Sequence, residues 1–299
     1  MTNPQTPRYP TTLALAIDYH TQQLAASPVG FGHGTTNARD EAAWLVLWSL
    51  GLPLDTDITD AFAQQYTLST AQQQALQSLF LARITTRQPA AYLTQEAWLQ
   101  GIGFYCDPRA IVPRSLIAEL LAEATFDPWL SDQTHRVLDV CTGNGSLAIL
   151  AAMAYPDTVV VASDISAPAL EVATINLHRH ALTDRVQLVQ CDGLNGLSGL
   201  FDLVLCNPPY VNAASMAQLP EEYRQEPVLA LAGGEDGMDF IRQLLIDLPR
   251  CLHPNGVLVL EIGNERAHFD QAFPTLPVNW LETSAGADQV VVIEAGDLI

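Results

Sequence analysis

The sequence predicts an α/β protein in which a doubly wound, mostly parallel sheet follows a small all-helical domain. Three features of the 299 residues support this fold class. Residues 1–90 carry the apolar spacing of helices, residues 91–114 are interrupted by glycine and proline, and residues 115–299 alternate β-branched runs with helical spacing. Alternating strands and helices build a parallel sheet that is covered on both faces, which explains why its strands are apolar throughout.

The predicted helical domain contains segments with helix-like spacing at Leu13–Leu24, Asn37–Leu50, Thr56–Tyr66 and Ser69–Arg87. Asn37 and Ser69 have side chains that suit the N-cap of a helix, and Asp40 adds an acidic first turn. After this domain, short aromatic and apolar stretches between glycines and prolines predict a β-hairpin linker within residues 91–114.

The predicted sheet domain covers residues 115–299. Its strands are expected at Arg136–Val140, Thr158–Ser163, Val186–Gln190, Phe201–Cys206, Val257–Ile262 and Gln289–Glu294. Its helices are expected at Ser146–Tyr155, Ala167–His180 and Asp236–Leu252.

The charge of the chain restricts its partners. The formal net charge is −20, and all 13 basic residues are arginines. Such a field repels nucleic acid and favours basic partners, although an acidic bias shared by all proteins of a salt-adapted organism is an alternative cause. We therefore expect no direct binding of nucleic acid.

The remaining composition predicts a cytoplasmic protein without a metal site. No apolar run approaches the roughly 18–20 residues that span a bilayer, and residues 1–10 are polar. The 5 cysteines are scattered and form no pair with zinc-ligand spacing, so we expect reduced thiols that pack as small apolar residues.

The first predicted strand leads into a candidate cofactor site. It ends near Asp139, and a turn with Gly143 and Gly145 connects it to a helix. Glycine lets the backbone approach a ligand because it carries no Cβ. Asp164 ends the next strand, where a carboxylate can accept hydrogen bonds from both hydroxyls of a ribose. Asp139 can bind an ammonium group, so this pattern favours S-adenosylmethionine, which has an amine and a ribose but no phosphate.

The same turn has two alternative interpretations. A dinucleotide-binding turn has a third glycine three residues after Gly145, where this sequence has Ala148. A tight turn that binds no ligand is the second alternative. Asp192, at the end of the third strand, can accept a hydrogen bond from the adenine amine, or can simply cap a surface turn. We also predict cofactor contacts from the adjacent residues Thr142, Ile165 and Gly193, and from Asn207 at the end of the fourth strand.

The fourth strand ends in Asn207-Pro208-Pro209-Tyr210, which predicts an acceptor site. The two prolines stiffen the backbone and hold Asn207 at the carboxyl end of the strand. The side-chain oxygen of Asn207 and the carbonyl oxygen of Pro208 can accept both hydrogens of an NH₂ group, which directs its nitrogen towards a methyl donor. Tyr210 offers a ring face for a planar group. These residues are therefore predicted to be catalytic and substrate-binding, with Pro209 as part of the acceptor site.

Taken together, these motifs resemble the HemK-like N5-glutamine methyltransferases over nearly the whole chain. The ribosomal-protein branch is indicated by segments that match its motifs, at residues 34–42, 141–145 and 216–227. Residues 112–115 match the loop that closes over the cofactor, and residues 231–237 match a glycine-rich segment of the family. Asn144 departs from that branch, where serine is more usual, and we expect little effect because the turn contributes its backbone.

The resemblance implies a class I methyltransferase domain, Rossmann-like in its sheet, after a helical domain that recognises the substrate. It implies S-adenosylmethionine as cofactor, with Arg114 as a cofactor-binding residue in a loop that closes over it. It implies methylation of a glutamine side chain in large-subunit ribosomal protein L-three. The alternatives are the Gly-Gly-Gln loop of peptide release factors, an adenine N6-methyltransferase and a non-catalytic assembly factor. The resemblance leaves the oligomeric state unknown.

Overall fold

The computed structural model describes residues 9–298, which divide into two compact units. The first unit contains the described residues up to Glu96 together with the short segment Pro220–Gln225, and the second contains the rest. The predicted domains are consecutive along the chain, so they do not assign Pro220–Gln225 to the first unit. Most of the polar N-terminal stretch, residues 1–8, lies outside the described residues. Between residues 9 and 298, no helix combines the length and the apolar character required to cross a bilayer.

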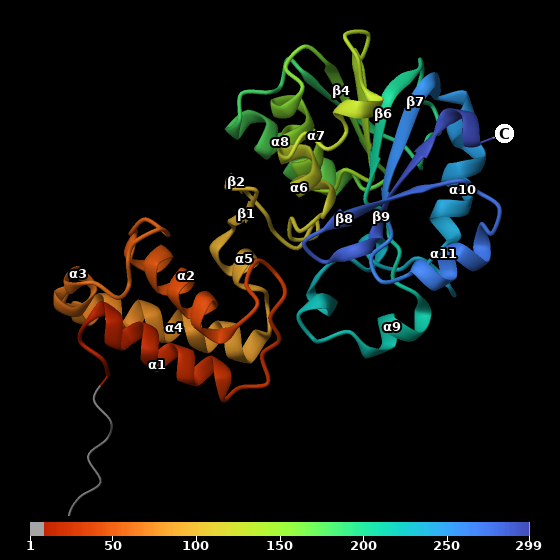
Figure 1. The fold of residues 1–299 in the computed structure, drawn as a ribbon. Helices are drawn as coiled ribbons and strands as arrows, with labels where there is room; N and C mark the ends of the chain where they lie inside the picture. The colour runs from red at the N-terminus through yellow and green to blue at the C-terminus, as the bar shows by residue number, and fades with distance from the viewer. Residues whose placement is uncertain (1–8, 299) are drawn as a thin grey trace, which may run out of the picture. The chain divides into compact units, whose positions relative to one another are not determined.

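The first unit is helical, as the apolar spacing predicts. Its helices are α1 (Leu13–Ala25), α2 (Ala38–Leu50), α3 (Ala61–Gln65), α4 (Thr70–Thr86) and α5 (Ala90–Thr94) (Figure 1). Both predicted N-caps are confirmed. Asn37 accepts hydrogen bonds from the backbone of Arg39 and Asp40, and Ser69 forms a reciprocal capping box with Gln72.

Two helices of this unit differ from the prediction. α3 begins at Ala61 rather than near Thr56, because Asp57 holds a turn through the backbone N–H of Thr59 and Asp60 caps the helix. α5 was not predicted, since it occupies one short turn in the stretch that was assigned to the linker. The hairpin itself is confirmed, with β1 (Ala97–Leu99) paired antiparallel to β2 (Ile102–Phe104) in the second unit.

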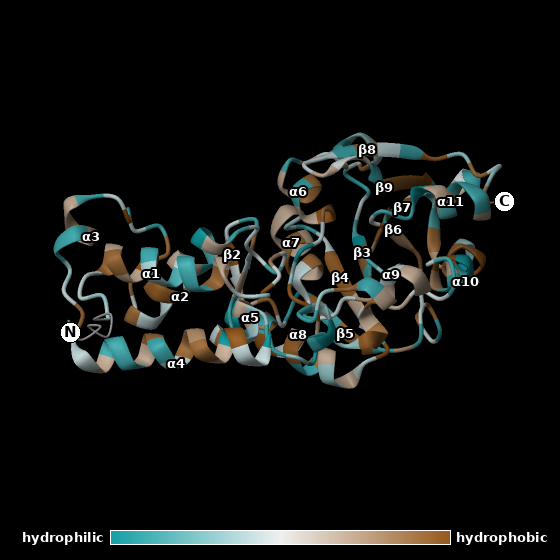
Figure 2. Cartoon of the chain, turned by 90° about the horizontal axis from the view of Figure 1, so that it is seen from below, coloured by the Kyte–Doolittle hydropathy of each residue, from teal (hydrophilic) through white to brown (hydrophobic). Residues whose placement is uncertain are grey.

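The core of the first unit is made by one face of each long helix. In Figure 2 these helices carry both hydrophobic and hydrophilic residues, as expected for elements that are buried on one side. Ile17 of α1, Leu45 of α2 and Leu76 and Phe80 of α4 belong to one buried cluster. Burial of a side chain of this kind contributes about 1.5–3 kcal/mol to folding.

A buried carboxylate fixes Pro220–Gln225 within the first unit. The carboxylate of Glu222 accepts two hydrogen bonds from Arg87, at 2.6 and 2.7 Å, and one from Arg83 at 3.1 Å. It also accepts the backbone N–H of Gly30 at 2.9 Å. Burial raises the pKa of Glu222, but the hydrogen bonds from Arg87, Gly30 and Arg83 outweigh it and lower the pKa to about 2.

Replacing Glu222 with glutamine is expected to lower the free energy of unfolding by about 3 kcal/mol, since loss of one partner leaves buried arginine charge uncompensated. Urea denaturation followed by tryptophan fluorescence measures the change. The matched control is Glu221→Gln, because Glu221 is exposed and pairs with Arg224 at 3.4 Å. This control is expected to cost at most about 0.5 kcal/mol. Equal effects from both variants would contradict a structural role for the buried carboxylate.

The same carboxylate predicts an acid dependence of stability. Its folded pKa lies below the value of 4.5 for an ordinary glutamate, so its stabilising contribution is present above about pH 4.5. The contribution is then lost as the pH falls towards 2. Wild-type protein should therefore lose more stability than Glu222→Gln over this interval.

The second unit is built on a seven-stranded sheet in the order β5-β4-β3-β6-β7-β9-β8. Its strands are β3 (Arg136–Val140), β4 (Val159–Asp164), β5 (Val186–Gln190), β6 (Phe201–Cys206), β7 (Leu252–Glu261), β8 (Asn279–Thr283) and β9 (Gly286–Glu294). Only β9 runs antiparallel to its two neighbours, and the other pairs are parallel. The predicted doubly wound, mostly parallel sheet is confirmed.

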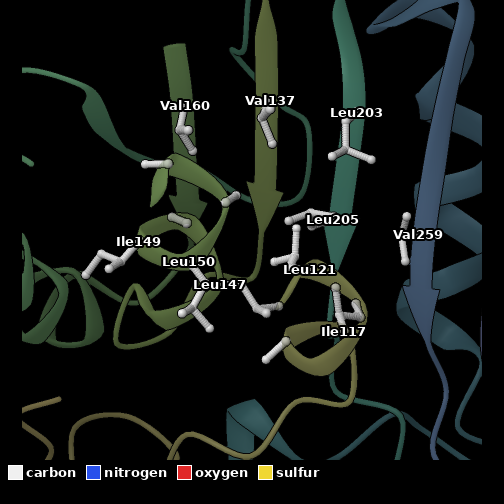
Figure 3. Close-up of a cluster of buried hydrophobic side chains, with 14 of the residues drawn as sticks. Ile117, Leu121, Val137, Leu147, Ile149, Leu150, Val160, Leu203, Leu205 and Val259 are labelled. Carbon is white, nitrogen blue, oxygen red and sulfur yellow. The ribbon is translucent and has the colours of Figure 1, made fainter. Parts of the chain in front are cut away.

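Helices cover both faces of this sheet. They are α6 (Ile117–Ala122), α7 (Ser146–Ala154), α8 (Ala167–Arg179), α10 (Asp239–Asp247) and α11 (Arg266–Ala272). A further helix, α9 (Ala213–Gln218), buries none of its residues. Figure 3 shows one apolar layer, which contains Ile117 and Leu147 from the helices and Val137 and Leu205 from the strands. The opposite layer contains Ile241 of α10 and residues of α11.

The boundaries of some sheet elements differ from the prediction. α10 begins at Asp239 rather than Asp236, because the Asp236 carboxylate accepts the backbone N–H of Met238 in the turn before the helix. β7 begins at Leu252, earlier than predicted, and β8 was not predicted. β8 is an edge strand with a half-buried pattern, which gives a weaker apolar signal than a covered strand does.

The sheet brings the predicted motifs together. Val140 at the end of β3 pairs with Ser163 of β4 on one side and with Cys206 of β6 on the other. The residues that follow these three positions therefore lie at one edge, the carboxyl ends of parallel strands.

Candidate functional site

A cavity lies at the carboxyl ends of β3, β4, β5 and β6 in the second unit. Seven of the predicted site residues line it, namely Gly143, Asp164, Ile165, Asp192, Gly193, Asn207 and Pro209. The wall also includes neighbours of these residues at the strand ends, Ala169 of α8 and Phe240 of α10. Two other segments contribute to it, at residues 109–111 and in the stretch from Pro227 to Ala230. The remaining predicted residues do not line the cavity. These are Arg114, Asp139, Thr142, Gly145, Pro208 and Tyr210.

The glycine turn after β3 leaves space for a ligand. Gly143 has a φ of +56°, and a Cβ added to it would meet no protein atom within 4 Å. Because Gly143 lines the cavity, such a Cβ would project into the space that a ligand could fill. Gly145 serves packing instead, since its Cβ would lie 3.1 Å from the Cβ of Ala173 in α8.

Asp139 lies fully buried beneath this turn. Its Oδ2 accepts the hydroxyl of Thr142 and the backbone N–H of Ala148 at 3.0 Å, and thus fixes the turn to α7. Its Oδ1 has no hydrogen-bond partner among residues 9–298. Burial raises the pKa of Asp139 to about 7, and the charge of Asp164 adds to this shift against the two hydrogen bonds. A cationic group near Oδ1 would favour the ionised form.

Asp164 connects the ends of β3 and β4. Its Oδ2 accepts the backbone N–H of Gly143 at 2.8 Å, and its Oδ1 accepts the N–H of Ser166 at the same distance. Burial raises the pKa of Asp164, and these backbone hydrogen bonds act in the opposite direction. Each carboxylate oxygen has a second lone pair, so the side chain can still accept hydrogen bonds from a ligand in the cavity.

The side chain of Asn144 contributes more than the sequence suggested. Its Oδ1 accepts the N–H of Ser146 at 3.1 Å, and its Nδ2 donates to the carbonyl oxygen of Ile111 at 3.3 Å. The expectation that only the backbone of this turn matters is therefore wrong. A serine could cap the helix but is too short to provide both contacts.

Asn207 is placed where an acceptor group could meet a ligand in the cavity. It follows Cys206, the last residue of β6, and lines the cavity together with Pro209. Within the described chain, its side-chain amide makes no hydrogen bond, and it is not part of either apolar layer. Its amide is therefore available to a ligand, as the Asn-Pro-Pro-Tyr motif predicts. Pro208 is buried behind it.

Tyr210 is held by residues that the sequence did not single out. Its hydroxyl donates to Oε1 of Glu261 at 3.2 Å, at the end of β7. Oε2 of Glu261 accepts the hydroxyl of Ser115 at 2.6 Å and the N–H of Leu116 at 2.9 Å. The ring also approaches Gly263, where a Cβ would lie 2.5 Å from a ring carbon. The ring orientation is thus set by Glu261 and Gly263.

A signal for Glu261 exists in the sequence but is weak. It is an acidic residue at the end of an apolar run, which is the pattern that drew attention to Asp139 and Asp164. Burial raises the pKa of Glu261, and the hydrogen bonds from Ser115, Leu116 and Tyr210 oppose this shift. The sequence around Glu261 does not indicate that Tyr210 is its hydrogen-bond partner.

Metal chemistry has no visible counterpart in the described part of the chain. Between residues 9 and 298, no group of three or more His, Cys, Asp or Glu side chains is arranged to hold a metal ion. The cavity instead combines a glycine cradle, acidic strand ends and an amide at one sheet edge.

Comparisons with known proteins agree with this geometry. The methyltransferase small domain family matches residues 117–222. Among solved structures, the hMettl16 catalytic domain in complex with MAT2A 3′UTR hairpin 6 is similar with a TM-score of 0.51. That comparison covers 75% of this chain and 81% of the other at 14% identity, so it supports the fold alone.

Curated relatives extend the similarity to nearly the full chain. The ribosomal protein uL3 glutamine methyltransferase of Bordetella pertussis is 50% identical over 285 residues, which cover 94% of each protein. The protein of the same name from Neisseria gonorrhoeae is 43% identical over 291 residues, covering 97% of this chain and 96% of the relative. The chain therefore belongs to the family of ribosomal protein uL3 glutamine methyltransferases, within the class I methyltransferase fold.

Proposed function

We propose that this protein transfers a methyl group from S-adenosylmethionine to the side-chain amide nitrogen of a glutamine in ribosomal protein uL3. The observation that carries the proposal is the shared cavity, in which Asn207 of the acceptor motif and Gly143 and Asp164 of the cofactor motif line one space. The names of the relatives supply the class of substrate.

The residues around the cavity fit the chemical groups of this cofactor. We assign the ribose hydroxyls to Asp164 and the adenine amine to Asp192, with Ile165 and Gly193 beside them. The open cradle at Gly143 can admit the amino-acid part. The unpartnered Oδ1 of Asp139 is the candidate acceptor for its ammonium. Thr142 and Gly145 support the turn rather than contact the ligand.

The acceptor amide requires help, because its nitrogen lone pair is delocalised into the carbonyl group. S-adenosylmethionine supplies an electrophilic methyl group. The side-chain oxygen of Asn207 and the carbonyl oxygen of Pro208 would accept the two N–H groups of the glutamine. These acceptors stabilise the positive charge that develops on nitrogen, and they hold it in line with the methyl group. Tyr210 and Pro209 would confine the planar amide, and the proton can leave to water afterwards.

The proposal is tested by incubating the protein with S-adenosylmethionine labelled in its methyl group and with purified uL3. Mass spectrometry of the product should find one methyl group on a glutamine side chain. A uL3 variant in which that glutamine is replaced by asparagine, with a shorter side chain, should accept none. Peptide release factor and DNA serve as competing substrates. Label in release factor but not in uL3 would overturn the choice of substrate, and label in DNA would overturn the choice of acceptor.

The location and the partner-binding surface follow from the same proposal. A protein that modifies a ribosomal protein would act in the cytoplasm. The helical domain predicted for residues 1–90 is the candidate for recognition of the protein substrate.

A further inference from the structure

The cavity wall contains two segments that lie far apart in the sequence. Arg109, Ala110 and Ile111 come from the stretch after the hairpin, whereas Pro227, Leu229 and Ala230 come from the stretch after α9. Neither stretch belongs to the sheet, so backbone pairing between strands does not hold them in place.

A buried ion pair connects these two segments next to the cavity. Glu226 directly precedes Pro227, and its side chain is completely inaccessible to solvent. Its carboxylate accepts two hydrogen bonds from the Arg114 guanidinium, at 2.5 and 2.7 Å. It also accepts the backbone N–H of Val112 at 2.9 Å, and Arg114 donates to the Val112 carbonyl oxygen at 3.2 Å. The backbone next to Ile111 is thus attached directly to the residue before Pro227.

Removal of either partner of this pair is expected to weaken the connection strongly. A bidentate pair of a guanidinium and a carboxylate is strong and directional, and it holds both partners in one geometry. When one partner of a buried pair is removed, the other is left without compensation and draws in water. Each segment would then be held only by its own contacts, such as that of Ile111 with Asn144 and that of Leu231 with Val211, and the cavity wall would open more readily on this side.

We propose that Glu226 and Arg114 form a clasp that closes the cofactor cavity, so that Arg114 acts as a positioning residue rather than as a direct ligand of S-adenosylmethionine. This inference rests on the proposed function, since it concerns the same cavity. It replaces the cofactor contact that the sequence suggested for Arg114, because the guanidinium is directed at Glu226 and does not line the cavity.

The clasp is tested by calorimetric titration of the full-length protein with S-adenosylhomocysteine. The variants are Glu226→Gln, Arg114→Met and the double variant. Each variant is expected to raise the Kd for S-adenosylhomocysteine about tenfold. This factor applies if the closed wall is populated in about a tenth of the variant molecules. The double variant should be no weaker than either single variant, because both remove the same connection. Independent effects that multiply in the double variant would overturn the proposal.

A second ligand separates a clasp from a direct contact. 5′-Methylthioadenosine lacks the amino-acid part of the cofactor, including the carboxylate that an arginine would bind. A clasp shapes the whole cavity, so both substitutions should weaken both ligands by a similar factor. If Arg114→Met weakens only S-adenosylhomocysteine while Glu226→Gln leaves both ligands unchanged, Arg114 is a ligand and the clasp is disproved.

Rescue and control variants distinguish loss of the clasp from misfolding of the protein. Arg114→Lys keeps a cation opposite Glu226 and should restore part of the affinity, whereas loss equal to that of Arg114→Met would contradict the proposal. Glu221→Gln removes an exposed glutamate five residues before Glu226 and should leave the Kd unchanged. In steady-state assays the clasp variants should raise KM for S-adenosylmethionine and leave kcat nearly constant.

The outcomes also separate this inference from the proposed function. If wild-type protein fails to bind S-adenosylhomocysteine, the proposed function fails. If wild-type protein binds it and the clasp variants bind equally well, only the clasp fails.

Discussion

Replacing Asn207 with alanine is expected to lower kcat by about a hundredfold to a thousandfold, with the Kd for S-adenosylhomocysteine changed by no more than a few-fold. The amide of Asn207 lines the cavity and makes no hydrogen bond within the described chain, so its removal disturbs no other contact of that amide. What is lost is an acceptor for an N–H group that becomes more positive in the transition state. Removal of one polar group that stabilises developing charge typically costs a factor of this size.

The measurement combines single-turnover methylation of uL3 with calorimetric titration of S-adenosylhomocysteine. Gln218→Ala is the control, since Gln218 is an exposed amide at the end of α9 and should leave both quantities unchanged. If Asn207→Ala abolishes ligand binding together with turnover, Asn207 holds the cofactor and its assignment to the acceptor is wrong. If kcat falls by less than about tenfold, the acceptor geometry does not depend on this oxygen.

Replacing Gly237 with alanine is expected to reduce kcat at least about a hundredfold and to destabilise the second unit. Gly237 has a φ of +82°, and an added Cβ would lie 2.2 Å from the backbone oxygen of Tyr210. This oxygen belongs to the backbone, so it cannot move away without displacing the acceptor motif. A shift of about 1 Å in a positioning element can cost a hundredfold in rate.

Gly196→Ala is a matched control for this variant. Gly196 also has a φ of +82°, but a Cβ there would meet nothing within 4 Å. It therefore carries only the backbone cost of a left-handed conformation, roughly 1–2 kcal/mol. The difference between the two variants in melting temperature and in kcat isolates the contact with Tyr210. Equal losses in both variants would show that backbone strain alone explains the effect.

Close packing explains the glycines of Leu231–Gly237, the segment that follows the acceptor motif in the sequence. Val211 donates to the carbonyl oxygen of Leu231 at 2.8 Å, and Gly233 donates back to Val211 at 2.9 Å. A Cβ on Gly233 would lie 2.8 Å from the backbone oxygen of Pro209. Leu231–Gly237 therefore packs against the backbone of the acceptor motif. This close packing is a steric reason for the glycines at these positions.

The sequence by itself determined most of the strands and seven of the residues that line the cavity. Apolar runs and glycine turns are local signals, and parallel strands that follow one another through helices place their carboxyl ends at one edge. Asp164, Asp192 and Asn207 could therefore be assigned to a common site before any contact was known. The prolines after Asn207 fixed its position through backbone restrictions that need no tertiary contact.

Only the tertiary structure decided which charged and aromatic side chains pair. Glu222 with Arg87, Glu226 with Arg114, and Tyr210 with Glu261 each join residues that are distant in sequence. A periodic pattern shows that a residue is buried or capped, but it contains no information on which of 13 arginines meets a given glutamate. That choice depends on strand order and loop path, because hydrogen bonds of this strength require atoms within about 3 Å of each other. Local chemistry therefore placed the site, and long-range packing decided how its walls are held.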